Sequence, residues 1–73
     1  MATEKVKAEI TGKVWKIVTQ PGQALEEEDT ILIMESMKME IPVVAPVKGT
    51  LKAILVQEGQ DVSEGQELAV IES

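Results

Sequence analysis

The chain has 73 residues and a formal net charge of −6, and it lacks cysteine, histidine and tyrosine. This length allows one small domain, residues 1–73, and the composition excludes disulfides, thiol chemistry and the commonest general base. The acidic balance argues against nucleic acid as a partner. No apolar run approaches the roughly 20 residues of a membrane span, and the N-terminus lacks a signal-peptide pattern. We therefore expect a cytoplasmic protein without a nucleic-acid or membrane partner, and we expect it to be monomeric when isolated.

In chain order, the sequence predicts short strands separated by turns. A first strand ends before Gly12, and residues 14–19 form a second strand rich in β-branched residues. The turn "QPGQ" follows, then a short extended stretch around Leu25 and the acidic turn "EED". The apolar residues 31–34 form the last strand of this half. The apolar spacing of residues 14–18 is not a clean alternation, which a bulge or a strand shared between sheets would explain.

The second half repeats the first. A shift of 37 positions aligns residues 1–36 with residues 38–73, and ten aligned pairs are identical. Each half therefore carries the same series of about four short strands, and the two copies predict two small sheets packed face to face about a pseudo-twofold axis. The identical pairs are Val6/Val43, Ala8/Ala45, Gly12/Gly49, Ile17/Ile54, Gln20/Gln57, Gly22/Gly59, Gln23/Gln60, Glu27/Glu64, Glu35/Glu72 and Ser36/Ser73.

The junction between the repeats reads "IMESMKME" and contains three of the four methionines of the chain. Residue 37 has no repeat partner, so the repeat places Met37 and Lys38 at the tip of a hairpin, far from both chain ends. Lys38 at such a tip is ordinarily a solvated charge, and Met34, Met37 and Met39 could simply fill the core. In a tight hairpin, however, at least one flanking methionine must be near the surface. An exposed lysine on a rigid β scaffold is also a good acceptor for an activated carboxylic acid.

With this junction, the chain resembles the biotinyl/lipoyl attachment domain family, and most closely its stand-alone attachment proteins. The resemblance covers essentially the whole chain, and it rests on the motif Met37-Lys38-Met39, followed by Ala45-Pro46, Gly49, Gly59 and Gly65. It implies an all-β fold, a flattened barrel or sandwich of two four-stranded antiparallel sheets. It also implies that Lys38 is the covalent attachment site, and that the ligase recognises Glu35, Ser36, Met37 and Met39.

The resemblance implies a carrier that has no catalytic groups of its own and binds no metal. A biotin protein ligase would attach biotin to Lys38. The arm would then carry CO₂ between the biotin carboxylase and carboxyltransferase subunits of a biotin-dependent carboxylase, with tethering making each encounter effectively intramolecular.

Glu35-Ser36 departs from the usual biotinyl pattern and is more like lipoyl domains. We therefore expect covalent lipoate, added by a lipoyl ligase, as an additional modification. Two alternatives stay open at this point: a lipoyl carrier of a 2-oxoacid dehydrogenase-type complex, and an unmodified barrel-sandwich module used for protein assembly. An autonomous enzyme is disfavoured because the chain has no histidine or cysteine, no phosphate loop and no paired acids in an evident cleft.

Three positions carry further expectations. Glu28 aligns with the turn glycine Gly65, so it either adopts a positive φ at a cost of roughly 1 kcal/mol or changes the turn shape. The run from Glu26 to Asp29 is read as a solvated acidic turn, with a partner contact as the alternative. Trp15 aligns with Lys52, which predicts a partly exposed tryptophan, either in edge packing or on a docking surface.

Overall fold

The computed structural model describes residues 2–73, and these residues form eight β-strands and no helix. β-Branched and other aliphatic residues dominate the strands, while glycines with positive φ occupy three of the turns between them. The strands are β1 (Thr3–Lys7), β2 (Gly12–Ile17), β3 (Ala24–Leu25), β4 (Thr30–Ser36), β5 (Met39–Val44), β6 (Gly49–Ile54), β7 (Asp61–Val62) and β8 (Glu67–Glu72).

The strands form two four-stranded antiparallel sheets, which confirms the predicted fold class. The sheet that we call the terminal sheet has the order β1-β8-β6-β3, and the hairpin sheet has the order β5-β4-β2-β7. Each sheet takes two strands from each repeat, so the halves interlock and neither half forms a sheet by itself. A shift of 37 residues converts one strand order into the other, as expected for a pseudo-twofold axis.

The second strand of each repeat differs from its predicted bounds. β2 begins at Gly12 and ends at Ile17, two residues earlier at both ends than the predicted strand 14–19. β6 begins at Gly49 and ends at Ile54, and it differs in the same way from the repeat-related prediction, 51–56. The sequence predicts a break at each of these glycines, but in the structure each glycine belongs to a paired strand and allows a neighbouring strand to approach closely. The irregular apolar spacing in β2 is explained by a bulge, because the pairing of β2 with β4 shifts register between Val14 and Lys16.

The core lies between the two sheets and follows the repeat. All but two of the buried hydrophobic residues form repeat-related pairs, the exceptions being Val6 and Val56. Both halves therefore contribute nearly the same side chains to one interior, which is the main source of stability. The pairs are Ala8/Ala45, Val14/Leu51, Leu25/Val62, Ile31/Leu68, Leu32/Ala69 and Met34/Ile71.

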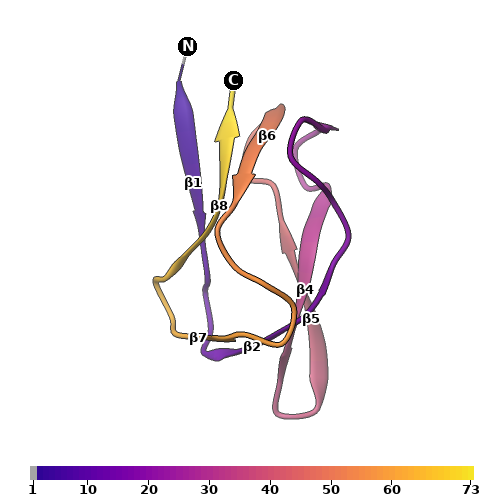
Figure 1. Cartoon of the computed structure of the whole chain (residues 1–73), viewed down its shortest axis with the longest axis vertical. Coiled ribbons are helices and arrows are strands. Elements are labelled where there is room, and N and C mark those ends of the chain that lie inside the picture. The colour runs from indigo at the N-terminus through magenta and orange to yellow at the C-terminus, as the bar shows by residue number, and fades with distance from the viewer. Residues whose placement is uncertain (1) are drawn as a thin grey trace.

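The molecule is elongated, with extents of 36 × 19 × 18 Å, and both chain ends lie at one end of the long axis (Figure 1). There the backbones of Ala2 and Ser73 exchange hydrogen bonds of 3.2 and 2.9 Å. The turn between β4 and β5 lies at the opposite end (Figure 1), which confirms the predicted position of the junction between repeats. No helix within residues 2–73 is long and apolar enough to cross a membrane.

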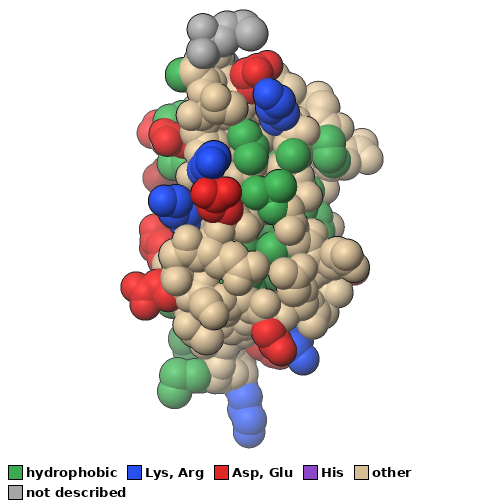
Figure 2. Space-filling model, turned by 60° about the vertical axis from the view of Figure 1, so that its left-hand side comes forward, with side chains coloured by type: hydrophobic (Ala, Val, Ile, Leu, Met, Phe, Trp, Pro, Cys, Tyr) green, Lys and Arg blue, Asp and Glu red, His purple; other side chains and the backbone are tan. Residues whose placement is uncertain are grey.

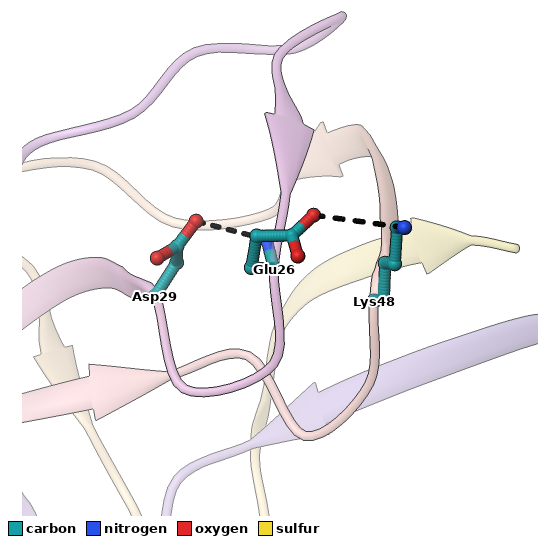
Figure 3. Close-up of polar contacts among 3 residues, drawn as sticks. All are labelled: Glu26, Asp29 and Lys48. Atoms are coloured by element: carbon teal, nitrogen blue, oxygen red, sulfur yellow. Dashed lines mark hydrogen bonds and ion pairs between the residues drawn. The ribbon is translucent and has the colours of Figure 1, made fainter.

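The acidic turn between β3 and β4 has a local structural role (Figure 3). The backbone N–H of Glu26 donates a 2.8 Å hydrogen bond to Oδ2 of Asp29, and the Glu26 carboxylate lies 3.9 Å from Nζ of Lys48. Both partners of this ion pair are largely exposed, so it adds little stability. Glu28 adopts a φ of 75°, close to the 88° of its repeat partner Gly65, so this turn keeps the glycine geometry without the glycine.

We expect Glu28→Gly to stabilise the protein. A left-handed backbone costs a non-glycine residue about 1–2 kcal/mol, and the extra flexibility of glycine in the unfolded chain returns part of this gain. The net increase in the free energy of unfolding should be about 0.5 kcal/mol, measured by urea denaturation. Glu27→Gly, at the neighbouring position, is the control and should not stabilise. An equal gain from both changes would contradict the backbone explanation.

Candidate functional site: an exposed lysine on a two-residue turn

Met37 and Lys38 form the whole connection between β4 and β5. Ser36 and Met39 are the last paired residues of the two strands, and both residues between them have positive φ, 53° for Met37 and 65° for Lys38. This is the geometry of the tightest hairpin turns, which match the twist of the strands and normally contain Asn-Gly or similar pairs. Neither residue here is glycine or asparagine, so the turn holds two non-glycine residues in the left-handed region, which costs free energy at both positions.

The base of this hairpin is fixed by a close approach of β2. A Cβ on Gly12 would lie 2.6 Å from the carbonyl oxygen of Glu35, so only glycine fits at this position. The hydroxyl of Ser36 donates a 3.1 Å hydrogen bond to the carbonyl oxygen of Thr11. The Thr11 hydroxyl in turn accepts a 3.2 Å bond from the backbone N–H of Glu64. The turn therefore projects from an anchored base.

The three methionines of the junction have different surroundings. Met34 is completely buried and belongs to the core, whereas Met37 and Met39 are 91% and 61% exposed. The core-packing interpretation is therefore right for Met34 and wrong for Met37 and Met39. Figure 2 shows hydrophobic and basic side chains protruding together at the end of the molecule where the β4–β5 hairpin lies.

Lys38 is exposed, and none of the three ion pairs found within residues 2–73 involves it. Glu35 and Glu40 face each other across β4 and β5 immediately below the turn, and both are exposed. Like charges at directly opposed positions destabilise a sheet, so this pair is not explained by folding. The structure thus brings together all five predicted site residues, Glu35, Ser36, Met37, Lys38 and Met39, at one end of the molecule.

The described surface has an open depression beside the turn and a groove further from it. A shallow, open depression of about 380 Å³ lies between the hairpin base and β7, and it is lined by Ser36, Met37 and Asp61 among others. A larger groove of about 430 Å³ runs between the edge strands β1 and β5 but includes neither residue of the turn. Within residues 2–73 no group of three or more acidic residues could hold a metal ion. The reactive feature of this end is therefore the lysine amine itself.

Sequence reasoning did not identify Thr11, Gly12 and Glu40 as parts of this site. Gly12 carried a usable signal, since it is identical to Gly49 in the repeat and stands at the start of a segment with irregular apolar spacing. The pairing of Glu40 with Glu35 follows directly once a two-residue turn at 37–38 is assumed. The Thr11 hydrogen bonds join segments 25 and 53 residues apart, and nothing in the local sequence predicts them.

We expect Met37→Ala and Met39→Ala to change the free energy of unfolding by no more than about 0.5 kcal/mol, because both side chains are exposed. Met34→Ala is the matched control, and loss of this buried side chain should cost about 2–5 kcal/mol. Enzymatic modification of the lysine should be slower in both surface variants, as followed by mass spectrometry. A loss of stability at Met37 or Met39 equal to that at Met34 would restore the core-packing interpretation.

Fold and site together define a small β-sandwich scaffold that presents one lysine on a strained turn. The family model described as "Biotin-requiring enzyme", for biotin and lipoyl domains, matches residues 2–71. The chain is 40% identical over 63 residues to the biotin/lipoyl attachment protein of Bacillus subtilis, covering 86% of each chain. It is also 40% identical over 68 residues to the biotinylated protein TB7.3 homolog of Mycobacterium leprae, covering 93% of this chain and 96% of that one.

A solved structure shows the same architecture. The crystal structure of the Kluyveromyces lactis urea carboxylase contains a segment that superposes with a TM-score of 0.93 and 36% sequence identity. The match covers 99% of the present chain and 6% of that much longer one. The chain therefore belongs to the biotin/lipoyl attachment domain family, which confirms the resemblance found in the sequence.

Proposed function

We propose that this protein is a carrier with biotin covalently attached to Nζ of Lys38, and that it acts as a swinging arm between the active sites of a biotin-dependent carboxylase. The observation that carries the proposal is the two-residue turn, which holds Lys38 exposed at the end opposite the termini and outside the three ion pairs found among residues 2–73. The biotinylated and carboxylase relatives support biotin as the group and a carboxylase as the host.

The attachment is an acyl transfer in which this chain supplies only the nucleophile. A biotin protein ligase would present biotin with its carboxyl group activated as an adenylate. The deprotonated Lys38 amine would attack the carboxyl carbon, an amide bond would form, and AMP would leave. The base that takes the proton would belong to the ligase, because the chain contains no histidine or cysteine. Bound biotin supplies a ring nitrogen that carries CO₂. The scaffold positions the arm and contributes no catalytic group.

Lipoate on the same lysine is a second candidate modification. The name of the Bacillus subtilis relative includes both groups, and Glu35-Ser36 precedes the motif in a lipoyl-like manner. The hydroxyl of Ser36 already donates to the carbonyl oxygen of Thr11, so a ligase would meet it mainly as an acceptor. The monomeric state, the cytoplasmic location, the single-domain organisation of residues 1–73 and the identity of the partner subunits stay predictions.

The decisive test is the intact mass, followed by peptide mapping, of the protein purified from its native cells. We expect a biotin-sized increment on the peptide that contains Lys38, and a lipoyl-sized one on a further fraction. Lys38 found unmodified, in cells whose biotin ligase is active, would overturn the proposal and favour the unmodified assembly module.

A further inference from the structure

The pseudo-twofold axis provides an internal comparison, because every position on the outer face of the hairpin sheet has a mate on the outer face of the terminal sheet. The row of the hairpin sheet nearest the turn crosses four strands and consists of Glu40, Glu35, Lys13 and Asp61. The mate row of the terminal sheet consists of Thr3, Glu72, Thr50 and Ala24. The two rows share a single carboxylate position, so the acidic character belongs to the end with the lysine turn.

Glu72 and Glu35 occupy mate positions in different surroundings. Glu72 forms an ion pair of 3.5 Å with Lys52. The mate of Lys52 is Trp15, so Glu35 has no cation at the corresponding place, and none of the ion pairs within residues 2–73 involves it. The hairpin sheet thus has Trp15, 47% exposed, where the terminal sheet has Lys52, and Glu35 beside it is in none of the ion pairs among residues 2–73.

The next positions on β5 continue this difference. Pro42 and Val44 are exposed on the hairpin sheet, and their mates on the terminal sheet are Lys5 and Lys7. Lys5 forms a second ion pair of 3.5 Å with Glu67. On the outer face of the terminal sheet, three lysines therefore balance two carboxylates. The lysines are Lys5, Lys7 and Lys52, and the carboxylates are Glu67 and Glu72. The hairpin sheet carries three carboxylates and two lysines around exposed apolar side chains, and no ion pair among residues 2–73 joins them.

The backbone on both sides of Trp15 is anchored by hydrogen bonds. Trp15 lies at the bulge of β2, where the register with β4 shifts between Val14 and Lys16, and bulges aim a side chain outward. The preceding residue, Val14, exchanges backbone hydrogen bonds of 2.7 and 2.9 Å with Gly59 and Gln60. Two residues further on, the N–H of Ile17 donates a 2.9 Å bond to the Glu58 carboxylate. The ring is thus presented by anchored backbone, which lowers the entropy cost of a contact.

From these differences we propose that the outer face formed by Trp15, Glu35, Glu40 and Pro42, here called the hairpin face, is the docking surface for the biotin protein ligase. The ligase would present an arginine or lysine that stacks on the indole of Trp15 and pairs with Glu35 and Glu40. This inference rests on the proposed function.

The reach of Lys38 favours the ligase over the carboxylase subunits as the partner. The ligase must bring the bare amine into its active site, and that amine stands on a stem of only four carbons. The ligase must therefore approach the rows directly below the turn. An enzyme that acts on the ring at the end of the finished arm can stay further away, and so needs this face less.

The test is steady-state biotinylation by the cognate biotin protein ligase, with biotin and ATP, followed by intact mass. Trp15→Lys gives the hairpin face the lysine of its mate position. Lys52→Trp places a tryptophan on the terminal sheet and is the matched control. For Trp15→Lys we expect the KM for the carrier to rise about tenfold with kcat unchanged, and for Lys52→Trp no change. The KM of the unaltered carrier should also rise with salt, because charged contacts are screened.

Each other outcome is informative. Equal KM values for Trp15→Lys and the unaltered protein would overturn the docking surface while leaving the carrier function intact. Equal increases in both variants would do the same, because the effect would then be independent of the face. If the unaltered protein is not biotinylated at all, the proposed function itself fails. Thermal unfolding of each variant ensures that the comparison is made on folded protein.

Discussion

We expect Lys38→Arg to remove modification completely and to leave the fold unchanged. The guanidinium group of arginine stays protonated in proteins and cannot act as the acceptor of an acyl group. The side chain at this position is exposed and forms none of the ion pairs within residues 2–73, so its replacement removes no internal contact. We expect no mass increment after incubation with biotin protein ligase, biotin and ATP, and a free energy of unfolding within about 0.5 kcal/mol of the original.

The remaining lysines provide the control for this experiment. Lys48→Arg alters another exposed lysine, which is paired only weakly with Glu26 at 3.9 Å. The protein with this change should be modified at Lys38 at the full rate. Residual modification of Lys38→Arg would mean that the ligase uses a second lysine, and the assignment of the attachment site would be wrong.

Gly12→Ala should be among the most destabilising single changes outside the core. The added Cβ would lie 2.6 Å from the carbonyl oxygen of Glu35, and this oxygen belongs to backbone that is paired on both sides. The strands would have to move apart, at a cost of about 3 kcal/mol by analogy with overpacked cores. A domain of this length is stable by only about 4–11 kcal/mol, so the midpoint of urea denaturation should fall clearly.

The repeat separates the effect on stability from the effect on the site. Gly49→Ala creates a matching 2.6 Å clash with the carbonyl oxygen of Glu72, at the end of the molecule that carries the termini, and its Cβ would also lie 2.8 Å from Cγ2 of Ile71. Both variants should lose stability, Gly49→Ala at least as much as Gly12→Ala, but only Gly12→Ala should also slow the modification of Lys38, measured at a temperature where both are folded. Gly22→Ala, with open space around the new Cβ but a φ of 94°, should cost only about 1–2 kcal/mol. Equal slowing in the two clash variants would contradict a local effect on the turn.

Much of this fold could be predicted because the sequence states it twice. The repeat of 37 residues predicts two equivalent sheets and a hairpin at the junction, and both are present. The repeat also placed Lys38 at the apex, since a twofold relation between the halves carries their junction onto the two chain ends and so puts the junction at the opposite end of the molecule. Partial exposure of Trp15 followed from its alignment with a lysine, and its accessibility is 47%.

Other features depend on contacts between segments distant in the chain. The interlocking of the halves was not predicted, because identical repeats are equally compatible with one sheet per half. The strand starts at Gly12 and Gly49 were missed, since a glycine that permits close approach and a glycine that ends a strand have the same local sequence. The roles of Thr11 and Glu40 require the register between strands, which composition does not specify.

The interlocked sheets also determine when the domain can fold as the chain is synthesised. β1, the first strand to be synthesised, has β8, the last strand, as its only neighbour in the terminal sheet. The hairpin sheet likewise needs β7 from the second half to reach its full width. A nascent chain that ends after the lysine turn therefore has no closed core to support that turn, because the partner strands do not yet exist. We expect this core to close only after β8 has been synthesised, and an enzyme that recognises the folded turn should act only after that point.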